Sequence, residues 1–88
     1  MQSPAAGDIR DWMVEYLAEL LGMGPTEIST TTSFEVYGLD STAAVGMSGD
    51  LSEWLGLKLD ADLAFEFPTI ASLAEHLAER VRASTSAS

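Results

Sequence analysis

The sequence of 88 residues contains no cysteine, no asparagine, one histidine and only four basic residues. Without cysteine there is no disulfide, no thiolate nucleophile and no cysteine-ligated metal site. Without asparagine there is no N-glycosylation sequon. A single histidine also excludes the paired histidines of zinc sites. These absences remove most familiar catalytic and metal-binding arrangements, so we expect neither an active site nor a bound metal.

Long apolar runs are missing as well. No stretch approaches the roughly 20 apolar residues that a membrane-spanning helix needs, so we expect no membrane association. Residues 1–7 lack both the basic and the apolar region of a signal peptide. A cytoplasmic location is therefore the expectation from the sequence.

Negative charge dominates the chain. Fourteen acidic residues against four basic ones give a formal net charge of −10. Nucleic acid is excluded as a partner, because phosphate binding needs lysine and arginine. No basic residue occurs between Arg10 and Lys58, so most of the chain presents a negative field that steers basic surfaces of partner proteins. Solubility alone is the simpler interpretation, and charge does not distinguish the two.

Apolar residues recur at the helical spacing of three and four over most of the chain. No segment alternates with the period of two that a half-buried strand would show. The pattern predicts a small all-α bundle of three main helices and one short helix. The expected helices cover residues 8–21, 41–55, 61–66 and 69–82, and the domain 8–82 is expected to lie between linkers at 1–7 and 83–88.

The predicted core follows from the apolar faces of these helices. A long connection, from about residue 22 to 39, carries Ile28 and Phe34, which we expect to tether it to the bundle. The other expected core residues come from the helices: Trp12, Tyr16, Leu20, Leu51, Leu55, Leu63, Phe65, Leu73 and Leu77.

One segment combines a long loop with a predicted helix start. Gly38-Leu39-Asp40-Ser41 places a serine hydroxyl at the N-terminus of the second main helix. Aspartate and serine both cap helices, and this local pattern by itself favours a simple cap. An attachment or reaction site at the serine is the alternative.

The wider sequence changes that balance. Gly38-Leu39-Asp40-Ser41 resembles the phosphopantetheine attachment motif of acyl carrier proteins. The similarity extends over roughly residues 8–81, and its elements occur in the order typical of that family: Phe34-x-x-Tyr37-Gly38, Leu57-x-Leu59, Phe65-Glu66-Phe67-Pro68-Thr69 and His76-Leu77. The Phe-x-Phe-Pro-Thr element is most similar to the carrier domains of modular polyketide synthases.

The resemblance implies a function. A phosphopantetheinyl transferase would attach 4′-phosphopantetheine covalently to Ser41, and the thiol of the arm would carry acyl groups as thioesters. The chain would have no catalytic activity of its own. Its partners would be the ketosynthase, acyltransferase or acyl-AMP ligase domains of a synthase, and the isolated domain is expected to be a monomer.

The second main helix departs from the family pattern after the serine. Thr42 stands where the family usually has leucine or isoleucine, and Gly46 where it often has glutamate. We hypothesise that small side chains here form a smooth docking strip; tolerated drift on a solvent-facing helix is the alternative. The candidate partner-recognition residues are Leu39, Asp40, Thr42, Val45, Gly46, Gly49, Asp50 and Glu53.

Two other functions remain open. A peptidyl carrier of a nonribosomal peptide system would use the same fold and the same serine. An acidic docking module would use the helices without any covalent cofactor.

Overall fold

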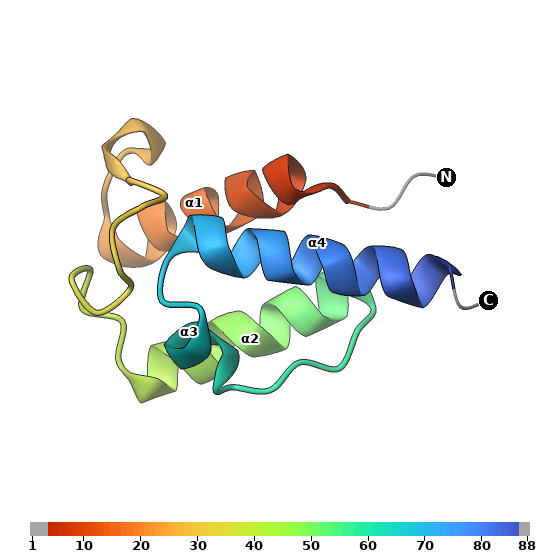
Figure 1. Cartoon of the computed structure of the whole chain (residues 1–88). Helices are drawn as coiled ribbons and strands as arrows, with labels where there is room; N and C mark the ends of the chain where they lie inside the picture. The colour runs from red at the N-terminus through yellow and green to blue at the C-terminus, as the bar shows by residue number, and fades with distance from the viewer. Residues whose placement is uncertain (1–3, 87–88) are drawn as a thin grey trace.

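The computed structural model describes residues 4–86 as a helical bundle (Figure 1). Within these residues there is no named strand, and the one isolated β-bridge joins Ser33 to Thr69. The predicted all-α fold, three main helices and a short one, is confirmed. The elements are α1 (Ala6–Leu21), the 3₁₀ turn η1 (Pro25–Glu27), α2 (Ser41–Leu55), α3 (Leu63–Glu66) and α4 (Ile70–Ser86).

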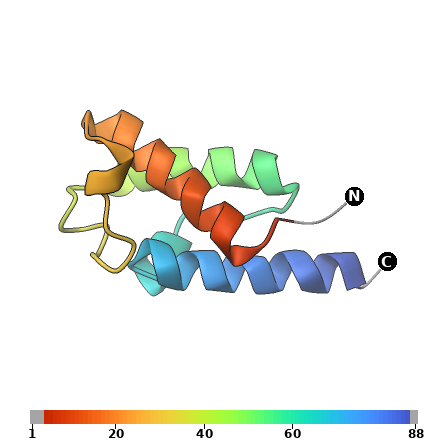
Figure 2. The same cartoon turned by 90° about the horizontal axis from the view of Figure 1, so that it is seen from above.

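The three long helices pack side by side, and α1 crosses the other two obliquely (Figure 2). The short α3 sits beside the first turn of α2 (Figure 1). Both ends of the described chain lie at the opposite end of the bundle from that turn. The first turn of α2 therefore stands clear of the chain termini.

Local capping chemistry sets most helix boundaries. Gly22 and Gly56 adopt left-handed conformations, each with φ of 69°, and end α1 and α2. The hydroxyl of Thr69 accepts a hydrogen bond from the Ser72 backbone N–H at 3.1 Å and so caps the start of α4. The start of α1 differs from expectation: Asp8 lies inside the first turn, and its carboxylate accepts from the Ala5 N–H at 3.0 Å.

The last helix also differs from the predicted bounds. α4 continues to Ser86, four residues beyond the expected end at residue 82, because neither glycine nor proline follows Arg82 to stop it. The expected linker at 83–88 is therefore helical through residue 86. Residues 1–3 and 87–88 of the two expected linkers lie outside the described residues.

The core forms where α1, α2 and α4 meet, and it corrects two predictions. Leu20 is 49% exposed and Phe65 is 62% exposed, although both were expected inside. In the last turns of α1, Leu17, Ala18 and Leu21 take the positions on the core, and Leu20 lies to one side of them. In the four-residue α3 only one side can face the core, and Leu63 and Ala64 occupy it. The largest fully buried side chains are Ile9, Met13, Leu17, Met47, Leu51, Ile70 and Leu77.

The long connection before α2 is anchored as predicted. Ile28 and Phe34 are buried in the core. The backbone N–H of Phe34 donates to the Pro68 carbonyl at 2.7 Å, and that of Ala71 donates to the Thr30 carbonyl at 2.9 Å. The loop is thereby attached to the chain just before α4 and to the first turn of that helix.

Truncating the loop anchor should destabilise the whole fold. We expect Phe34→Ala to lower the free energy of unfolding by about 3–5 kcal/mol, as large-to-small changes of buried phenylalanine do. Val36→Ala is the matched control in the same loop, because Val36 is 73% exposed, and it should change stability by less than about 0.5 kcal/mol. Urea unfolding measures both. Equal effects would show that the loop is not held by its buried ring.

Candidate functional site

Ser41 is the first residue of α2 and is exposed to solvent. Asp40 precedes it as the N-cap, and its carboxylate accepts a hydrogen bond from the Ala43 N–H at 2.8 Å. The remaining free N–H groups and the positive end of the helix dipole surround the serine. The aspartate therefore caps the helix, and the serine is exposed, as an attachment site requires.

The residues before the serine fix its position. Gly38 has φ of 78°, a left-handed conformation that a side chain would strain. This turn brings the Leu39 N–H to the Phe34 carbonyl at 3.0 Å and places the Leu39 side chain in the core. The Tyr37 hydroxyl accepts from the Ser29 N–H at 2.6 Å and closes the preceding part of the loop. The serine is thus presented by an anchored loop.

Most of the candidate partner-recognition residues are accessible. Seven of the eight are exposed, and Val45 is exposed over 55% of its surface. Leu39 is the exception, because its buried side chain anchors the motif. The exposed residues are Asp40, Thr42, Val45, Gly46, Gly49, Asp50 and Glu53. Their roles in recognition stay predictions.

The two helix glycines have different surroundings. A Cβ built on Gly46 would lie 3.5 Å from the Tyr16 hydroxyl of α1, whereas one on Gly49 would meet nothing within 4 Å. Tyr16 also interacts with Asp50 on α2. Burial, and then the charge and hydrogen bonding of Asp50, raise the pKa of the Tyr16 hydroxyl above its ordinary value of 10.0. Gly46 therefore borders a contact between two helices, and Gly49 faces open space.

Sequence reasoning missed an aromatic stack next to this contact. The rings of Trp12 and Tyr16 stack with centroids 5.2 Å apart, and those of Trp12 and Trp54 stack at 5.7 Å. The spacing of four between Trp12 and Tyr16 signals their contact within α1. The partnership with Trp54 comes from the packing of α1 against α2, and no local pattern indicates it.

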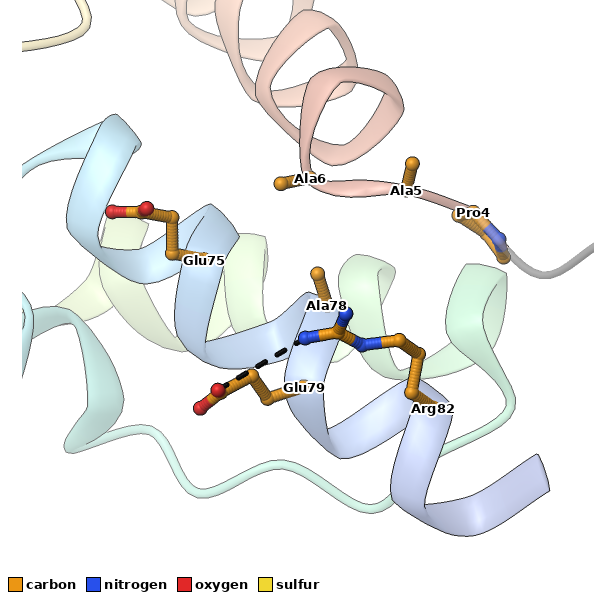
Figure 3. Close-up of a pocket in the computed structure, with 7 residues that line it drawn as sticks. All are labelled: Pro4, Ala5, Ala6, Glu75, Ala78, Glu79 and Arg82. Carbon is orange, nitrogen blue, oxygen red and sulfur yellow. Dashed lines mark ion pairs between the residues drawn. The ribbon is translucent and has the colours of Figure 1, made fainter. Parts of the chain in front are cut away.

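Two cavities lie at opposite ends of the molecule. The smaller, of about 160 Å³, adjoins the motif and is lined by residues of the loop, α2 and α3: Ser33, Phe34, Glu35, Leu39, Ala44, Ala64, Phe65 and Pro68. The larger, of about 320 Å³, lies between the start of α1 and α4 and is lined by Pro4, Ala5, Ala6, Glu75, Ala78, Glu79 and Arg82 (Figure 3). Size does not identify the functional one, because of these two cavities it is the smaller that has a motif residue, Leu39, in its lining.

The larger cavity contains little specific chemistry. Arg82 pairs with Glu79 at 3.9 Å, and both side chains are largely exposed. Such a surface pair contributes little to stability.

Among residues 4–86, no three acidic or histidine side chains cluster as metal ligands would. None of the described helices combines the length and hydropathy that crossing a bilayer requires.

Residues 11–77 match a known protein family, the phosphopantetheine attachment site. The acyl carrier protein TtuC of Teredinibacter turnerae is 35% identical over 75 residues, which are 85% of this chain and 86% of that protein. A segment of the phenolphthiocerol/phthiocerol polyketide synthase of Mycobacterium tuberculosis is 39% identical over 71 residues. Those residues are 81% of this chain and 4% of the synthase polypeptide that contains them.

The fold has matches among solved structures as well. A free-standing peptidyl carrier protein from a secondary metabolic pathway of Acinetobacter baumannii superposes with a TM-score of 0.83 at 31% identity. The match covers 88% of this chain and 96% of that protein. The overall fold of this chain is thus shared with a carrier protein of known structure.

The raised pKa of Tyr16 predicts a loss of stability in alkaline solution. Because the folded state holds the phenolic proton more tightly, this contribution is complete below about pH 10 and declines as the pH rises through the folded-state pKa. Tyr16→Phe lacks the ionisation. Urea unfolding at pH 8 to 11 should therefore show wild type losing stability relative to the variant above pH 10. Parallel curves would contradict the burial of this hydroxyl beside Asp50.

Proposed function

Because the chain belongs to the phosphopantetheine attachment site family, we propose that Ser41 is the residue that bears its prosthetic arm. Domains of this family carry covalently attached 4′-phosphopantetheine, and the chain is an acyl carrier domain. The observation that supports Ser41 is its position: an exposed hydroxyl at the start of α2, in the Gly38–Ser41 motif inside the matched region.

The residues around the serine suit a phosphate ester. Free backbone N–H groups and the helix dipole favour negative charge at the N-terminus of α2. A serine without a neighbouring base is a weak nucleophile, and the one histidine of the chain, His76, stacks on Phe67 at 4.2 Å instead. We therefore assign activation of the hydroxyl, and any metal needed for it, to a phosphopantetheinyl transferase. The carrier itself performs no catalysis.

The cavity beside the motif limits how the cargo is held. Its volume of about 160 Å³ is well below the roughly 300 Å³ at which small-molecule pockets begin. Apolar surface from Phe34, Leu39 and Ala44 can support a short segment of the arm. A long acyl chain would not be enclosed, so the thioester would stay accessible to the next enzyme.

The partners follow from this role. Relatives of the chain include segments of multienzyme synthases, and we propose that ketosynthase, acyltransferase or acyl-AMP ligase domains exchange acyl groups with it. Asp40, Asp50 and Glu53 would attract basic surfaces on them. A monomeric state and a cytoplasmic location stay predictions.

A peptidyl cargo is the second candidate. The free-standing peptidyl carrier of similar structure favours it, because that protein shares the fold at 31% identity. The acyl assignment agrees with the acyl carrier protein and polyketide synthase relatives. The group found on the arm after purification from the native host distinguishes the two.

Loading with the arm tests the attachment site. Incubation with coenzyme A and a broad-specificity phosphopantetheinyl transferase should add one phosphopantetheine group to the intact protein, as measured by mass spectrometry. Ser41→Ala should abolish the gain. Ser84→Ala removes another exposed serine hydroxyl, on α4, and should load as wild type does. Unmodified wild-type protein, under conditions that load a known carrier, would leave the non-covalent docking module as the function.

Substitutions of Asp40 separate its capping role from recognition. Asparagine caps helices about as well as aspartate, whereas alanine costs about 1 kcal/mol. We expect Asp40→Asn to keep the unfolding midpoint near that of wild type and to lower kcat/KM for loading about tenfold, since a charged hydrogen bond contributes about 1.5 kcal/mol. Asp40→Ala should lower both quantities. Normal loading of Asp40→Asn would restrict the residue to capping.

A further inference from the structure

The strongest feature that arm attachment leaves unexplained is the aromatic stack across α1 and α2. We call Tyr16, Trp12 and Trp54 the aromatic ridge; their rings stack in that order at 5.2 and 5.7 Å. Trp54 is 41% exposed, and the other two rings are half-buried against the core. The ridge thus joins the two helices and also presents aromatic surface to solvent.

Acidic side chains surround this surface. On α1, Glu15 follows Trp12 by three residues and Glu19 follows Tyr16 by three; on α2, Asp50 precedes Trp54 by four. Residues three or four apart are neighbours on a helix surface. All three acids are exposed. Neither α2 nor the part of α1 after Arg10 contains a basic residue to neutralise them.

An exposed indole ring with carboxylates nearby, as at Trp54, matches the chemistry of arginine. A guanidinium group stacks on an aromatic face and donates in a planar fork to a carboxylate, whereas the lysine ammonium is a compact, strongly hydrated charge. We propose that the aromatic ridge is a docking site for a protein partner that presents arginine side chains. This site goes beyond arm attachment and does not depend on which group Ser41 carries.

The Trp54 end of the ridge is well separated from the serine. Ser41 begins α2 and Trp54 lies in its last turn, about 20 Å further along the helix at a rise of about 1.5 Å per residue. A partner bound at the Trp54 end would hold the body of the carrier and leave the serine end free. Each exposed cation–π contact contributes only about 0.5–1 kcal/mol, so docking would be weak and readily reversed.

Binding of defined peptides tests the proposal on the full chain. The probes are capped hexa-arginine and capped hexa-lysine. Both tryptophans of the protein belong to the ridge, so their indole N–H signals in NMR spectra report on it directly. We expect hexa-arginine to shift both signals and to bind more tightly than hexa-lysine. Equal affinities without movement of the indole signals would overturn the proposal.

Matched variants separate the ridge from general charge attraction. The pair Glu15→Gln and Glu19→Gln removes two charges beside the ridge, and the pair Glu75→Gln and Glu79→Gln removes two from α4. Isothermal titration should show weaker hexa-arginine binding for the first pair and near wild-type binding for the second. Equal losses would mean that net charge alone acts, and the docking site would be rejected.

The aromatic contribution has its own variants. Trp54→Leu should weaken hexa-arginine binding about two- to fivefold, the equivalent of 0.5–1 kcal/mol, while Trp54→Phe should retain most of the affinity. Phe65→Ala removes an exposed ring outside the ridge and should change nothing. Unchanged binding by Trp54→Leu would show that the ridge only joins α1 to α2. Loading of Ser41 in the two Trp54 variants should remain normal, so a failure here is distinguishable from a failure of the attachment site.

Discussion

The attachment of the long loop to the start of α4 is the constraint on which the presentation of Ser41 depends. The Phe34 N–H bonds to the Pro68 carbonyl while its ring fills the core, and Leu39 then bonds back to Phe34. These contacts fix the position of the loop residues that lead into α2. An unanchored loop would have to be ordered each time an enzyme bound the serine, and that ordering would cost conformational entropy.

The same small fold must leave its functional surfaces uncovered. A domain of this size buries only a modest share of its surface, and here the buried share is the junction of α1, α2 and α4. The exposed side chains of Val45, Trp54 and Phe65 lie outside it. The net negative charge keeps such a surface soluble and gives it a preference for basic partners. Brief, selective contacts are what a carrier that must release its cargo requires.

Much of the fold was predictable because its signals are local. The bounds of α2 matched the prediction at both ends, because Asp40 caps its start and Gly56, directly after Leu55, ends it. α4 continued past its predicted end because the sequence after Arg82 contains no glycine or proline that would end a helix. Leu20 and Phe65 were misplaced because periodicity identifies an apolar face but not how much of it neighbouring helices cover. The candidate recognition residues on α2 stay predictions for a similar reason. Their exposure allows a partner to contact them, but it does not determine which of them a partner contacts.

The sequence by itself determined the helices, the serine motif and the excess of acid, because caps, periodicity and charge are properties of neighbouring residues. Only the tertiary structure decided that Leu39 is an anchor, that Gly46 borders Tyr16, and that Trp12 stacks on Trp54. The last two contacts join residues of different helices, and their geometry depends on how α1 crosses α2. No spacing within one segment of the chain specifies that crossing.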